Sequence, residues 1–495
     1  MPRPEEYEVL ILGSGKSGKS LAGHLAGSGH RTAVVERRWI GGACPNVKCL
    51  PSKNEIWSAK VADLVHHAAR FGLVTGPITI DMGRVRERKR AMVRDEVADR
   101  LALYKASGVE LIMGAGRFVA PKTLEVHLND GGTRVLVGNR VFLNLGTDPA
   151  IPPIVGLVDS RPMTNIELLE LDRLPEHLVV LGGGYVGLEF AQAYRRFGSR
   201  ATVVARGLQL LVREDPDIAE EVRRFLCAEH IEVLLGAEVL RVEGRSPEGV
   251  RLHTRTAEGE RIIAGSDILV ATGRTPNFAE TGLERAGVEL DPRGYIKVNH
   301  RLETTAPDVW AMGECAGSPQ FTHVAFDDFR IVRDNLAGGN RSARDRLVPF
   351  CLFTDPPLAR VGMTEAEARQ QGIAVRVAKL PMTAVLRTHT TGETTGSMKV
   401  LVEAIGDRIL GFTMIGPEAG EVIAAVQTAM LGGLPYMLFR DAILAHPTMA
   451  EGLNALFATI PAAESLGRRR YNPEYTTEAT RTGATSNSRS PKGIG

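Results

Sequence analysis

Two glycine-rich segments with the same layout limit the folds open to this chain of 495 residues. Residues 13–20 read GSGKSGKS after the apolar run YEVLIL, and residues 182–187 read GGGYVG after HLVVL. A helix-forming stretch follows each segment, so both fit a strand, a glycine turn and a helix whose N-terminus binds a pyrophosphate. The pattern G-x-G-x-x-G is carried by Gly13, Gly15, Gly18, Gly182, Gly184 and Gly187. The sequence therefore predicts two dinucleotide-binding units in an α/β fold.

The first segment also fits the phosphate-binding loop of an ATPase. That pattern, G-x-x-x-x-G-K-S, is formed by Gly13, Gly18, Lys19 and Ser20. The next strand favours the dinucleotide, because RTAVVE ends in Glu36, about 20 residues beyond the glycines, where a carboxylate accepts ribose hydroxyls. An ATPase would need another strand ending in a magnesium-binding Asp, and the sequence offers no convincing one. An ATPase stays the alternative.

The second unit has an arginine where the first has its carboxylate. Its second strand ends in Ala205-Arg206. A guanidinium at this place pairs with the 2′-phosphate of NADPH, which favours NADPH over NADH, although NADH stays possible. Arg213 is a weaker candidate for the same phosphate, and Arg206 as a solvated loop residue is the alternative.

The stretch GGACPNVKCLPSK, residues 41–53, holds two neighbouring cysteines, Cys44 and Cys49. Residues five apart in a regular helix are separated by about 7.5 Å along the axis, which is farther than a disulfide allows. Cys44 is therefore expected at or before a helix start, with Pro45 in the first turn and Cys49 in the opening turns. There the helix dipole favours a Cys49 thiolate, and Lys53 lies on the same face. Two reduced cysteines packed as small hydrophobic side chains are the alternative.

Composition excludes several classes of partner. The net charge is +2 with acidic and basic residues intermixed, so neither nucleic acid nor an acidic substrate is indicated. No cysteine or histidine pair has the spacing of a zinc site. The N-terminal MPRPEEY is polar, unlike a signal peptide, and the apolar stretch 422–439 is broken by Gln427 and Gly432. We expect a buried helix there, no membrane span, and a cytoplasmic protein.

Together these segments resemble the class I pyridine nucleotide-disulfide oxidoreductases, the flavoprotein family of glutathione reductase, dihydrolipoamide dehydrogenase and mercuric reductase. The likeness runs from about residue 6 to residue 460. The resemblance implies FAD and NADPH as cofactors, with Cys44 as the thiol that exchanges with substrate and Cys49 as the thiolate beside the flavin. It also implies that Lys53 pairs with Glu189 and that Tyr185 gates the nicotinamide site. Helix capping by Glu189 and core packing by Tyr185 are the alternatives.

Two further motifs extend the resemblance. ATGRTPN, residues 271–277, resembles the return crossing from the nicotinamide unit to the flavin unit, and TTAPDVWAMGE, residues 304–314, resembles the second FAD motif. The last residue of that motif, which holds the ribityl chain, is Glu314 where the family usually has Asp. The resemblance assigns further cofactor contacts to Gly42, Lys53, Gly146, Thr147, Gly273, Arg274 and Gly313.

The stretch AHPTMAEGLNALF carries His446 and Glu451, which match the acid–base pair of the family. Imidazole titrates near neutral pH, and a carboxylate holds its ring in the tautomer that thiol deprotonation requires. In the family this pair reaches into the active site of the partner subunit, so the resemblance implies a homodimer.

Two positions of the cysteine loop depart from the family. Pro45 stands where the family tends to have an aliphatic residue, and Lys48 stands where it tends to have Gly. A cation beside Cys49 lowers the pKa of that thiol if it points inward, and it is equally free to point to solvent. GSPQFTHVAFDDFRIVRDNL, residues 317–336, is most similar to a mercuric-reductase-like branch that includes reductases of Cu(II). The implied substrate is a small disulfide or a metal ion.

The expected fold is α/β, with two Rossmann-like dinucleotide-binding domains and a C-terminal α+β dimerisation domain. The expected ranges are 1–148 and 272–345 for the FAD domain, 149–271 for the nicotinamide domain, 346–466 for dimerisation and 467–495 for a disordered tail. Residues 84–108 are expected to form an amphipathic helix with a solvated face. The predicted enzyme passes electrons from NAD(P)H through FAD and a Cys44–Cys49 disulfide to its substrate. A flavin-binding redox sensor or dimeric scaffold without dithiol turnover is the alternative.

Overall fold

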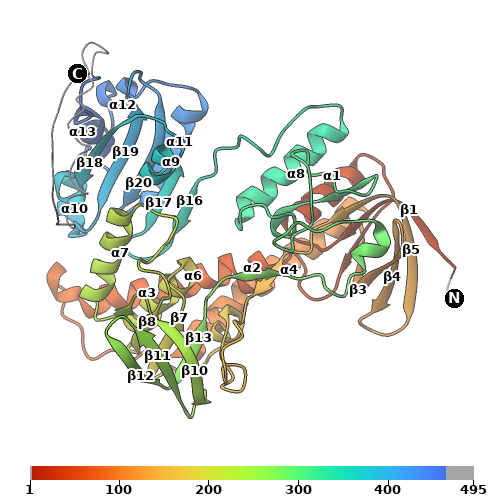
Figure 1. Cartoon of the computed structure of the whole chain (residues 1–495), viewed down its shortest axis with the longest axis horizontal. Helices are drawn as coiled ribbons and strands as arrows, with labels where there is room; N and C mark the ends of the chain where they lie inside the picture. The colour runs from red at the N-terminus through yellow and green to blue at the C-terminus, as the bar shows by residue number, and fades with distance from the viewer. Residues whose placement is uncertain (1–2, 464–495) are drawn as a thin grey trace, which may run out of the picture.

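The computed structural model describes residues 3–463, in which three large sheets organise the chain (Figure 1). The C-terminal part, blue in Figure 1, lies above the green middle part in that view, and the N-terminal sheet lies to the right. The predicted disordered tail, 467–495, lies outside the described residues. No helix within residues 3–463 is long and apolar enough to cross a membrane.

The first sheet carries the N-terminal glycine turn. Its elements and their flanking helices are β1 (Glu5–Leu12), α1 (Lys16–Gly27), β2 (Thr32–Glu36), β3 (Glu110–Ala120), β4 (Thr123–Leu128), β5 (Thr133–Leu143), β15 (Val309–Ala311) and α8 (Thr322–Leu336). Strands β3, β2, β1, β5 and β15 pair in parallel, and β4 joins β3 to β5 antiparallel. Every residue of β2 is buried, as expected for a parallel strand covered on both faces. The chain leaves this sheet after β5 and returns to it at β15.

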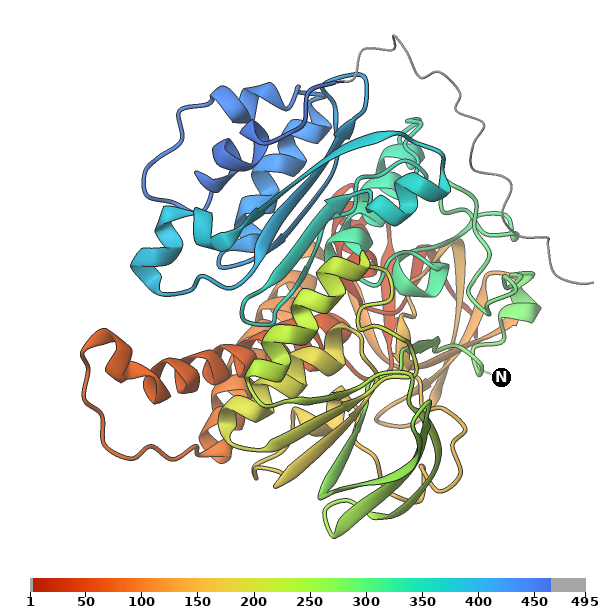
Figure 2. The same ribbon diagram turned by 60° about the vertical axis from the view of Figure 1, so that its left-hand side comes forward.

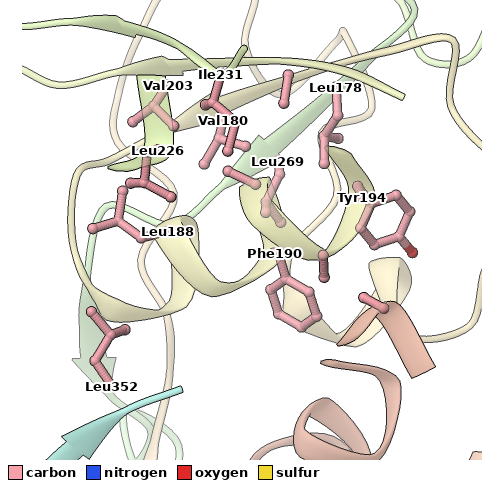
Figure 3. Close-up of a cluster of buried hydrophobic side chains, with 14 of the residues drawn as sticks. Leu178, Val180, Leu188, Phe190, Tyr194, Val203, Leu226, Ile231, Leu269 and Leu352 are labelled. Carbon is pink, nitrogen blue, oxygen red and sulfur yellow. The ribbon is translucent and has the colours of Figure 1, made fainter. Parts of the chain in front are cut away.

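The second sheet repeats the same local pattern. Its elements are β7 (His177–Leu181), α6 (Tyr185–Phe197), β8 (Arg200–Val204), α7 (Pro216–Ala228), β9 (Glu232–Leu234) and β13 (Asp267–Val270). Between β9 and β13 the chain forms a separate antiparallel sheet of β10 (Glu238–Arg245), β11 (Gly249–Thr256) and β12 (Gly259–Gly265). Strands β13, β7, β8 and β9 are parallel. Figure 3 shows their core, where Leu188 and Phe190 of α6 share one buried cluster with Val180 and Leu269. Both predicted glycine turns therefore connect a parallel strand to a helix.

A two-stranded ribbon marks where the chain passes between these sheets. Strand β6 (Thr147–Pro149) leaves the first sheet, and β14 (Arg274–Pro276) pairs with it antiparallel on the way back. The Nε atom of Arg274 donates to Oγ1 of Thr147 at 2.7 Å, so a side chain also joins the two crossings. The predicted return crossing at residues 271–277 is confirmed.

The C-terminal part is one antiparallel sheet, in the order β16, β17, β20, β19, β18, with helices packed against it. Its elements are β16 (Phe350–Leu352), β17 (Leu358–Gly362), α9 (Glu365–Gln370), β18 (Val375–Pro381), α10 (Leu386–Thr391), β19 (Ser397–Glu403), β20 (Ile409–Ile415), α11 (Ala419–Leu431), α12 (Met437–Asp441) and α13 (Gly452–Ala458). Helix α11 buries Val422, Ile423 and Val426 and ends just before Gly432. The apolar stretch forms the predicted helix, but only one face of that helix is buried in the protomer, because Ala424, Ala425 and Leu431 are exposed.

The remaining helices are α2 (Ala43–Val47), α3 (Cys49–His66), α4 (Met82–Ser107), α5 (Asn165–Leu168) and the short 3-10 turns η1 (Ala68–Phe71), η2 (Leu283–Ala286), η3 (Gly313–Ala316) and η4 (Met382–Ala384). Helices α3 and α4 lie side by side and project from the body of the molecule (Figure 2). The helix predicted over 84–108 is confirmed by α4. One charged residue, Lys89, does not belong to the solvated face of this helix, because it is only 1% exposed. Its Nζ lies 2.6 Å from Oε2 of the equally buried Glu55 and also donates to the Leu169 carbonyl.

The Glu55–Lys89 pair gives a first prediction. Replacement of Lys89 by Met leaves the Glu55 carboxylate buried without its cation, so the free energy of unfolding should fall by about 3 kcal/mol. Urea unfolding followed by circular dichroism measures this, and the double variant Glu55→Gln, Lys89→Met should recover part of the loss. Arg84→Met, which removes an exposed cation of the same helix, should change the value by less than about 0.5 kcal/mol. Equal effects of Lys89→Met and Arg84→Met would contradict the prediction.

Candidate active site

A large cavity of about 810 Å³ lies at the carboxyl ends of the first sheet. Its wall includes many of the residues singled out in the sequence, namely Gly13, Gly15, Glu36, Gly42, Cys44, Cys49, Gly146, Thr147, Gly313 and Glu314. This is the edge at which parallel α/β sheets bind nucleotides, because the strand ends and helix N-termini meet there. The first glycine turn and both cysteines therefore share one cavity.

The glycine turn fits closely against the backbone around it. Gly13 has φ +99°, and a Cβ atom there would lie 2.3 Å from the Asn144 carbonyl oxygen. A Cβ on Gly42 would lie 2.6 Å from Cα of Gly15. Side chains are therefore excluded where the backbone must approach a phosphate at the start of α1. The backbone N–H of Gly18 donates to Oδ1 of Asn144 at 3.0 Å, which fixes the first turn of α1.

Sequence reasoning missed Asn144, which also lines the cavity and whose Nδ2 donates to the Met312 carbonyl at 2.8 Å. A polar residue directly after a buried parallel strand was the available signal, because such residues stand at the ligand edge of the sheet. Asn144 thereby ties the first glycine turn to the segment before η3.

Glu36 ends β2 and is 8% exposed at the cavity wall. Its Oε2 accepts from the backbone N–H and the hydroxyl of Ser14, and its Oε1 accepts from the backbone N–H groups of Arg38 and Trp39. The carboxylate is thus held firmly in place before any ribose arrives. Ribose hydroxyls would have to share these oxygen atoms.

Cys44 lies at a helix start with Pro45 in the first turn, as predicted, but the prediction that Cys49 falls in the opening turns of that same helix is wrong, because a second helix begins at Cys49. Cys44 is in α2, Lys48 interrupts the helix with φ −127° and ψ −106°, and Cys49 begins α3. The reason is Pro51, which has no N–H to bond the Val47 carbonyl and whose ring would clash with it. That carbonyl instead accepts from Nδ2 of Asn165 at 2.5 Å. The thiolate position predicted at a helix start holds for Cys49, on α3.

The two thiols have opposite acidities. A hydrogen bond from Cys44 lowers the pKa of Cys49 to about 6 against the effect of burial, with help from Thr322, Lys53 and Lys48. The Sγ atom of Cys49 lies 3.4 Å from Oγ1 of Thr322, a residue that the sequence did not suggest. The same hydrogen bond and burial raise the pKa of Cys44 far above its ordinary value. In the reduced pair, Cys49 therefore carries the negative charge and Cys44 the proton.

Lys53 and Glu189 meet as predicted. Nζ of Lys53, one turn into α3, lies 2.7 Å from Oε2 of Glu189 on α6. The other oxygen of this buried carboxylate accepts from the backbone N–H of Phe353 at 2.9 Å, and the Phe353 ring lies 4.8 Å from the lysine Nζ. The pair therefore joins the cysteine helix to the second glycine unit.

The second glycine turn is also closely packed. A Cβ on Gly182 would lie 2.3 Å from the Ala271 carbonyl oxygen, and one on Gly187 would lie 2.5 Å from the Gly182 carbonyl oxygen. Around Gly184 and Gly273 the space is open, which leaves room for a ligand at the start of α6. This turn does not line the large cavity. Arg206 is exposed, and its side chain makes no hydrogen bond or ion pair within residues 3–463.

Tyr185, the first residue of α6, is held by neighbours from two parts of the chain. Its hydroxyl donates to Oε1 of Glu214 at 3.3 Å, and Oε2 of this buried carboxylate accepts from Nε of Arg360 at 2.8 Å. The tyrosine ring lies 5.3 Å from that of Phe350. Burial and the nearby Glu214 raise the pKa of Tyr185. After Asn144 and Thr322, Glu214 is a third residue that sequence reasoning missed.

Glu314 is held by two cations. Nζ of Lys48 lies 2.9 Å from Oε1 and 2.8 Å from Oε2, and Nε of Arg274 lies 3.4 Å from Oε2. The hydroxyl of Thr147 also donates to Oε2. Burial would raise the pKa of Glu314, but the two cations and these hydrogen bonds outweigh it and lower the pKa. Lys48 therefore points inward, the orientation that the sequence left open.

His446 and Glu451 form a pair at the surface of the protomer. Nδ1 of His446 lies 2.9 Å from both carboxylate oxygens of Glu451, and the imidazole is 61% exposed. Neither residue lines the cavity that contains Cys44 and Cys49. One protomer therefore presents this pair outward, away from its own cysteines.

Comparison with known proteins identifies the family. Residues 7–328 match the family described as pyridine nucleotide-disulphide oxidoreductase, and residues 348–456 match the dimerisation domain of that family. The chain belongs to this family. It is an oxidoreductase, and membership implies FAD and NAD(P)H as its cofactors. The second match supports a homodimer. The ATPase alternative has no support from these matches.

Relatives of the family cover nearly the whole chain. RclA of Escherichia coli K12 is 37% identical over 92% of this chain and 99% of its own length. A mercuric reductase of Acidithiobacillus ferrooxidans is 34% identical over 91% of this chain and 82% of its own. The structure of the Cu(II) complex of RclA, a flavoprotein disulfide reductase induced by HOCl, superposes with TM-score 0.84 at 35% identity, over 92% of this chain and 99% of that one.

The site accommodates the cofactors that this oxidoreductase family implies. The cavity of about 810 Å³, the closed glycine cradle at α1 and the held Glu36 suit FAD. The open space at Gly184 suits the nicotinamide cofactor, whose phosphates would meet the N-terminus of α6. Neither FAD nor the nicotinamide cofactor would meet a side chain at the glycine positions of the two turns.

The acidity of Cys49 gives a second prediction. In reduced, cofactor-free protein, alkylation of the Cys49 peptide by iodoacetamide should become half-maximal near pH 6, because the thiolate is the nucleophile. Lys53→Met should move that midpoint to higher pH, since it removes a cation that stabilises the thiolate. Cys351, whose pKa burial raises to about 12, serves as the internal control in mass spectra. A midpoint above pH 8 would contradict the assignment.

Proposed function

We propose that this chain is an NADPH-dependent flavoprotein that reduces a Cys44–Cys49 disulfide and passes the electron pair to a disulfide or metal-ion substrate. The observation that carries the proposal is that Cys44 and Cys49 lie together on the wall of the cavity, with Cys49 at the start of α3 and with a pKa of about 6. An acidic thiolate beside a protonated partner is the arrangement that dithiol exchange requires. Inert structural cysteines would lie in apolar surroundings with raised pKa values, as Cys315 and Cys351 do.

The cofactors would be held by residues from both glycine units. The residues proposed to hold FAD are Gly13, Gly15, Gly18, Glu36, Gly42, Lys53, Gly146, Thr147, Gly273, Arg274, Gly313 and Glu314. Gly182, Gly184, Tyr185, Gly187 and Arg206 would hold NADPH. Bound FAD supplies two-electron chemistry, accepting hydride from NADPH and passing the electron pair to the disulfide. The buried Lys53–Glu189 pair would keep a positive charge beside that reaction.

The thiol steps follow from the acidities of the pair. Cys44 needs a base because its pKa is raised, and we assign that base to His446 of the partner subunit, oriented by Glu451. The Cys44 thiolate attacks a substrate disulfide and releases one thiolate, which takes the proton from the imidazolium. Cys49 then attacks Sγ of Cys44, re-forms the Cys44–Cys49 disulfide and releases the second thiolate, which takes a proton from solvent.

Metal ions are the second substrate class, supported by the Cu(II) complex of RclA and by the mercuric reductases. The dithiol has two electrons to give. It would reduce two Cu(II) ions to Cu(I), or one Hg(II) ion to mercury, as the disulfide re-forms and the one proton of the pair, that of Cys44, leaves. Turnover assays with Cu(II), Hg(II) and small disulfides at equal NADPH distinguish these substrates.

Further proposals concern organisation. We assign the FAD domain to 1–148 and 272–345, the nicotinamide domain to 149–271 and the dimerisation domain to 346–466. In the homodimer, the outward His446–Glu451 pair would complete the cysteine site of the partner subunit. A cytoplasmic location fits an enzyme that draws on NADPH and works through free thiols.

The choice of NADPH is tested at Arg206. Arg206→Gln should raise the KM for NADPH about tenfold and leave that for NADH unchanged, because it removes the charge that would pair with the 2′-phosphate. Steady-state kinetics with both nucleotides measures this. Arg213→Gln is the matched comparison on the same exposed segment. If Arg213→Gln has the larger effect, the phosphate contact belongs to Arg213; if neither variant responds, the preference for NADPH is wrong.

The dithiol mechanism is tested by anaerobic titration of purified protein with NADPH. At two electrons the flavin spectrum should gain a long-wavelength charge-transfer band from the Cys49 thiolate, and Cys49→Ser should abolish it. Cys44→Ser should keep flavin reduction by NADPH and lose at least about 99% of substrate turnover. Direct bleaching of the flavin in the parent protein would instead favour a redox sensor without dithiol turnover.

A further inference from the structure

Two of the departures of this chain from the family pattern, Lys48 and Glu314, contact each other at the cavity wall. Lys48 stands where the family tends to have Gly, and Glu314 stands where it usually has Asp. The two residues lie far apart in the sequence, yet the lysine Nζ contacts both oxygens of the glutamate. Both side chains are 18% exposed, so the contact is largely shielded from water.

The hydrogen bonds of the carboxylate show what Lys48 does there. Oε2 of Glu314 has three partners, from Lys48, Thr147 and Arg274. Within residues 3–463, Oε1 has Lys48 as its sole partner. A carboxylate oxygen accepts about two hydrogen bonds, so Oε1 keeps one position for a ligand hydroxyl. Without Lys48, Oε1 of Glu314 would lose the only hydrogen-bond donor that residues 3–463 offer it, and nothing would hold this oxygen toward the cavity.

We propose that Lys48 is a positioning residue for FAD, which orients Glu314 toward the cofactor and balances its charge. The two departures then form one matched change, in which the longer acid requires the cation. The inference rests on the proposed function only in that FAD occupies this cavity. It adds that the cysteine loop itself, through Lys48, contributes to the cofactor site.

Charge also favours this pairing. The Glu314 carboxylate lies at the wall of the cavity, and hydride transfer to a bound flavin would add negative charge to the same cavity. Two fixed cations, Lys48 and Arg274, face that carboxylate. Removal of Lys48 leaves a buried negative charge with one cation fewer, which costs stability and disfavours additional negative charge nearby. Both cofactor affinity and flavin potential should therefore depend on Lys48.

The test uses the full-length protein. Its FAD is removed and added back while flavin fluorescence gives the dissociation constant, and the flavin midpoint potential is measured on the holoprotein. Lys48→Met should weaken FAD binding by about tenfold and shift the potential to more negative values. The double variant Lys48→Gly, Glu314→Asp should return affinity to within about threefold of the parent protein, while Lys48→Gly alone should not. Lys60→Met removes a cation of α3 that pairs with Asp355 and Glu393 outside the cavity, and it should leave both values unchanged.

Two results would overturn the inference. One is a Lys48→Met protein with parental FAD affinity and potential. The other is a double variant that binds FAD no better than Lys48→Gly, which would mean that Lys48 acts without Glu314. If Lys48→Met does not fold, Glu314→Gln keeps the shape of the side chain and should weaken FAD binding about as much. A parent protein that binds no FAD would refute the proposed function, whereas a parent protein that binds FAD with indifferent variants refutes only this inference.

Discussion

Helix α3 is the element on which the arrangement of the site depends, because charged side chains tie it to three other parts of the chain. Directly before its first residue, Lys48 pairs with Glu314 of η3. One turn later, Lys53 pairs with Glu189 of α6, and farther along Lys60 pairs with Asp355 before β17. These contacts join the first sheet, the second sheet and the C-terminal sheet through one helix. Contacts with all three sheets therefore fix the position of Cys49 at the start of this helix.

The charges around this helix also separate the roles of the two thiols. Cys49 begins α3, where Lys53 and Lys48 add to the hydrogen bond from Cys44 and lower its pKa. Cys44 lies in the preceding short helix, and its own pKa is raised by that hydrogen bond and by burial. One stable thiolate and one protonated thiol thus result from a break of the helix between them. In the proposed homodimer, the exposed His446–Glu451 pair would supply the base that Cys44, with its raised pKa, requires.

Elements that depend on local pattern were predictable, and those that depend on distant residues were not. Both glycine turns, the return crossing at 271–277 and helix α4 were predictable because each depends on local pattern: strand, turn and helix periodicity. The single helix across the cysteines was wrong because Pro51, six residues beyond Pro45, forbids it, and the competing hydrogen bond to the Val47 carbonyl comes from the distant Asn165. The burial of Lys89 was not predictable for a related reason, since its partner Glu55 lies on another helix.

The sequence by itself determined the two dinucleotide units, the cysteine pair, the family and hence the class of chemistry, because these are properties of residue type and short spacing. Only the tertiary structure decided that Lys48 points inward to Glu314, that Glu214 holds Tyr185, and that Thr322 contacts Cys49. Each of these contacts joins residues at least 29 positions apart. Such pairings depend on how sheets and helices pack, and packing brings together side chains whose proximity no local pattern encodes.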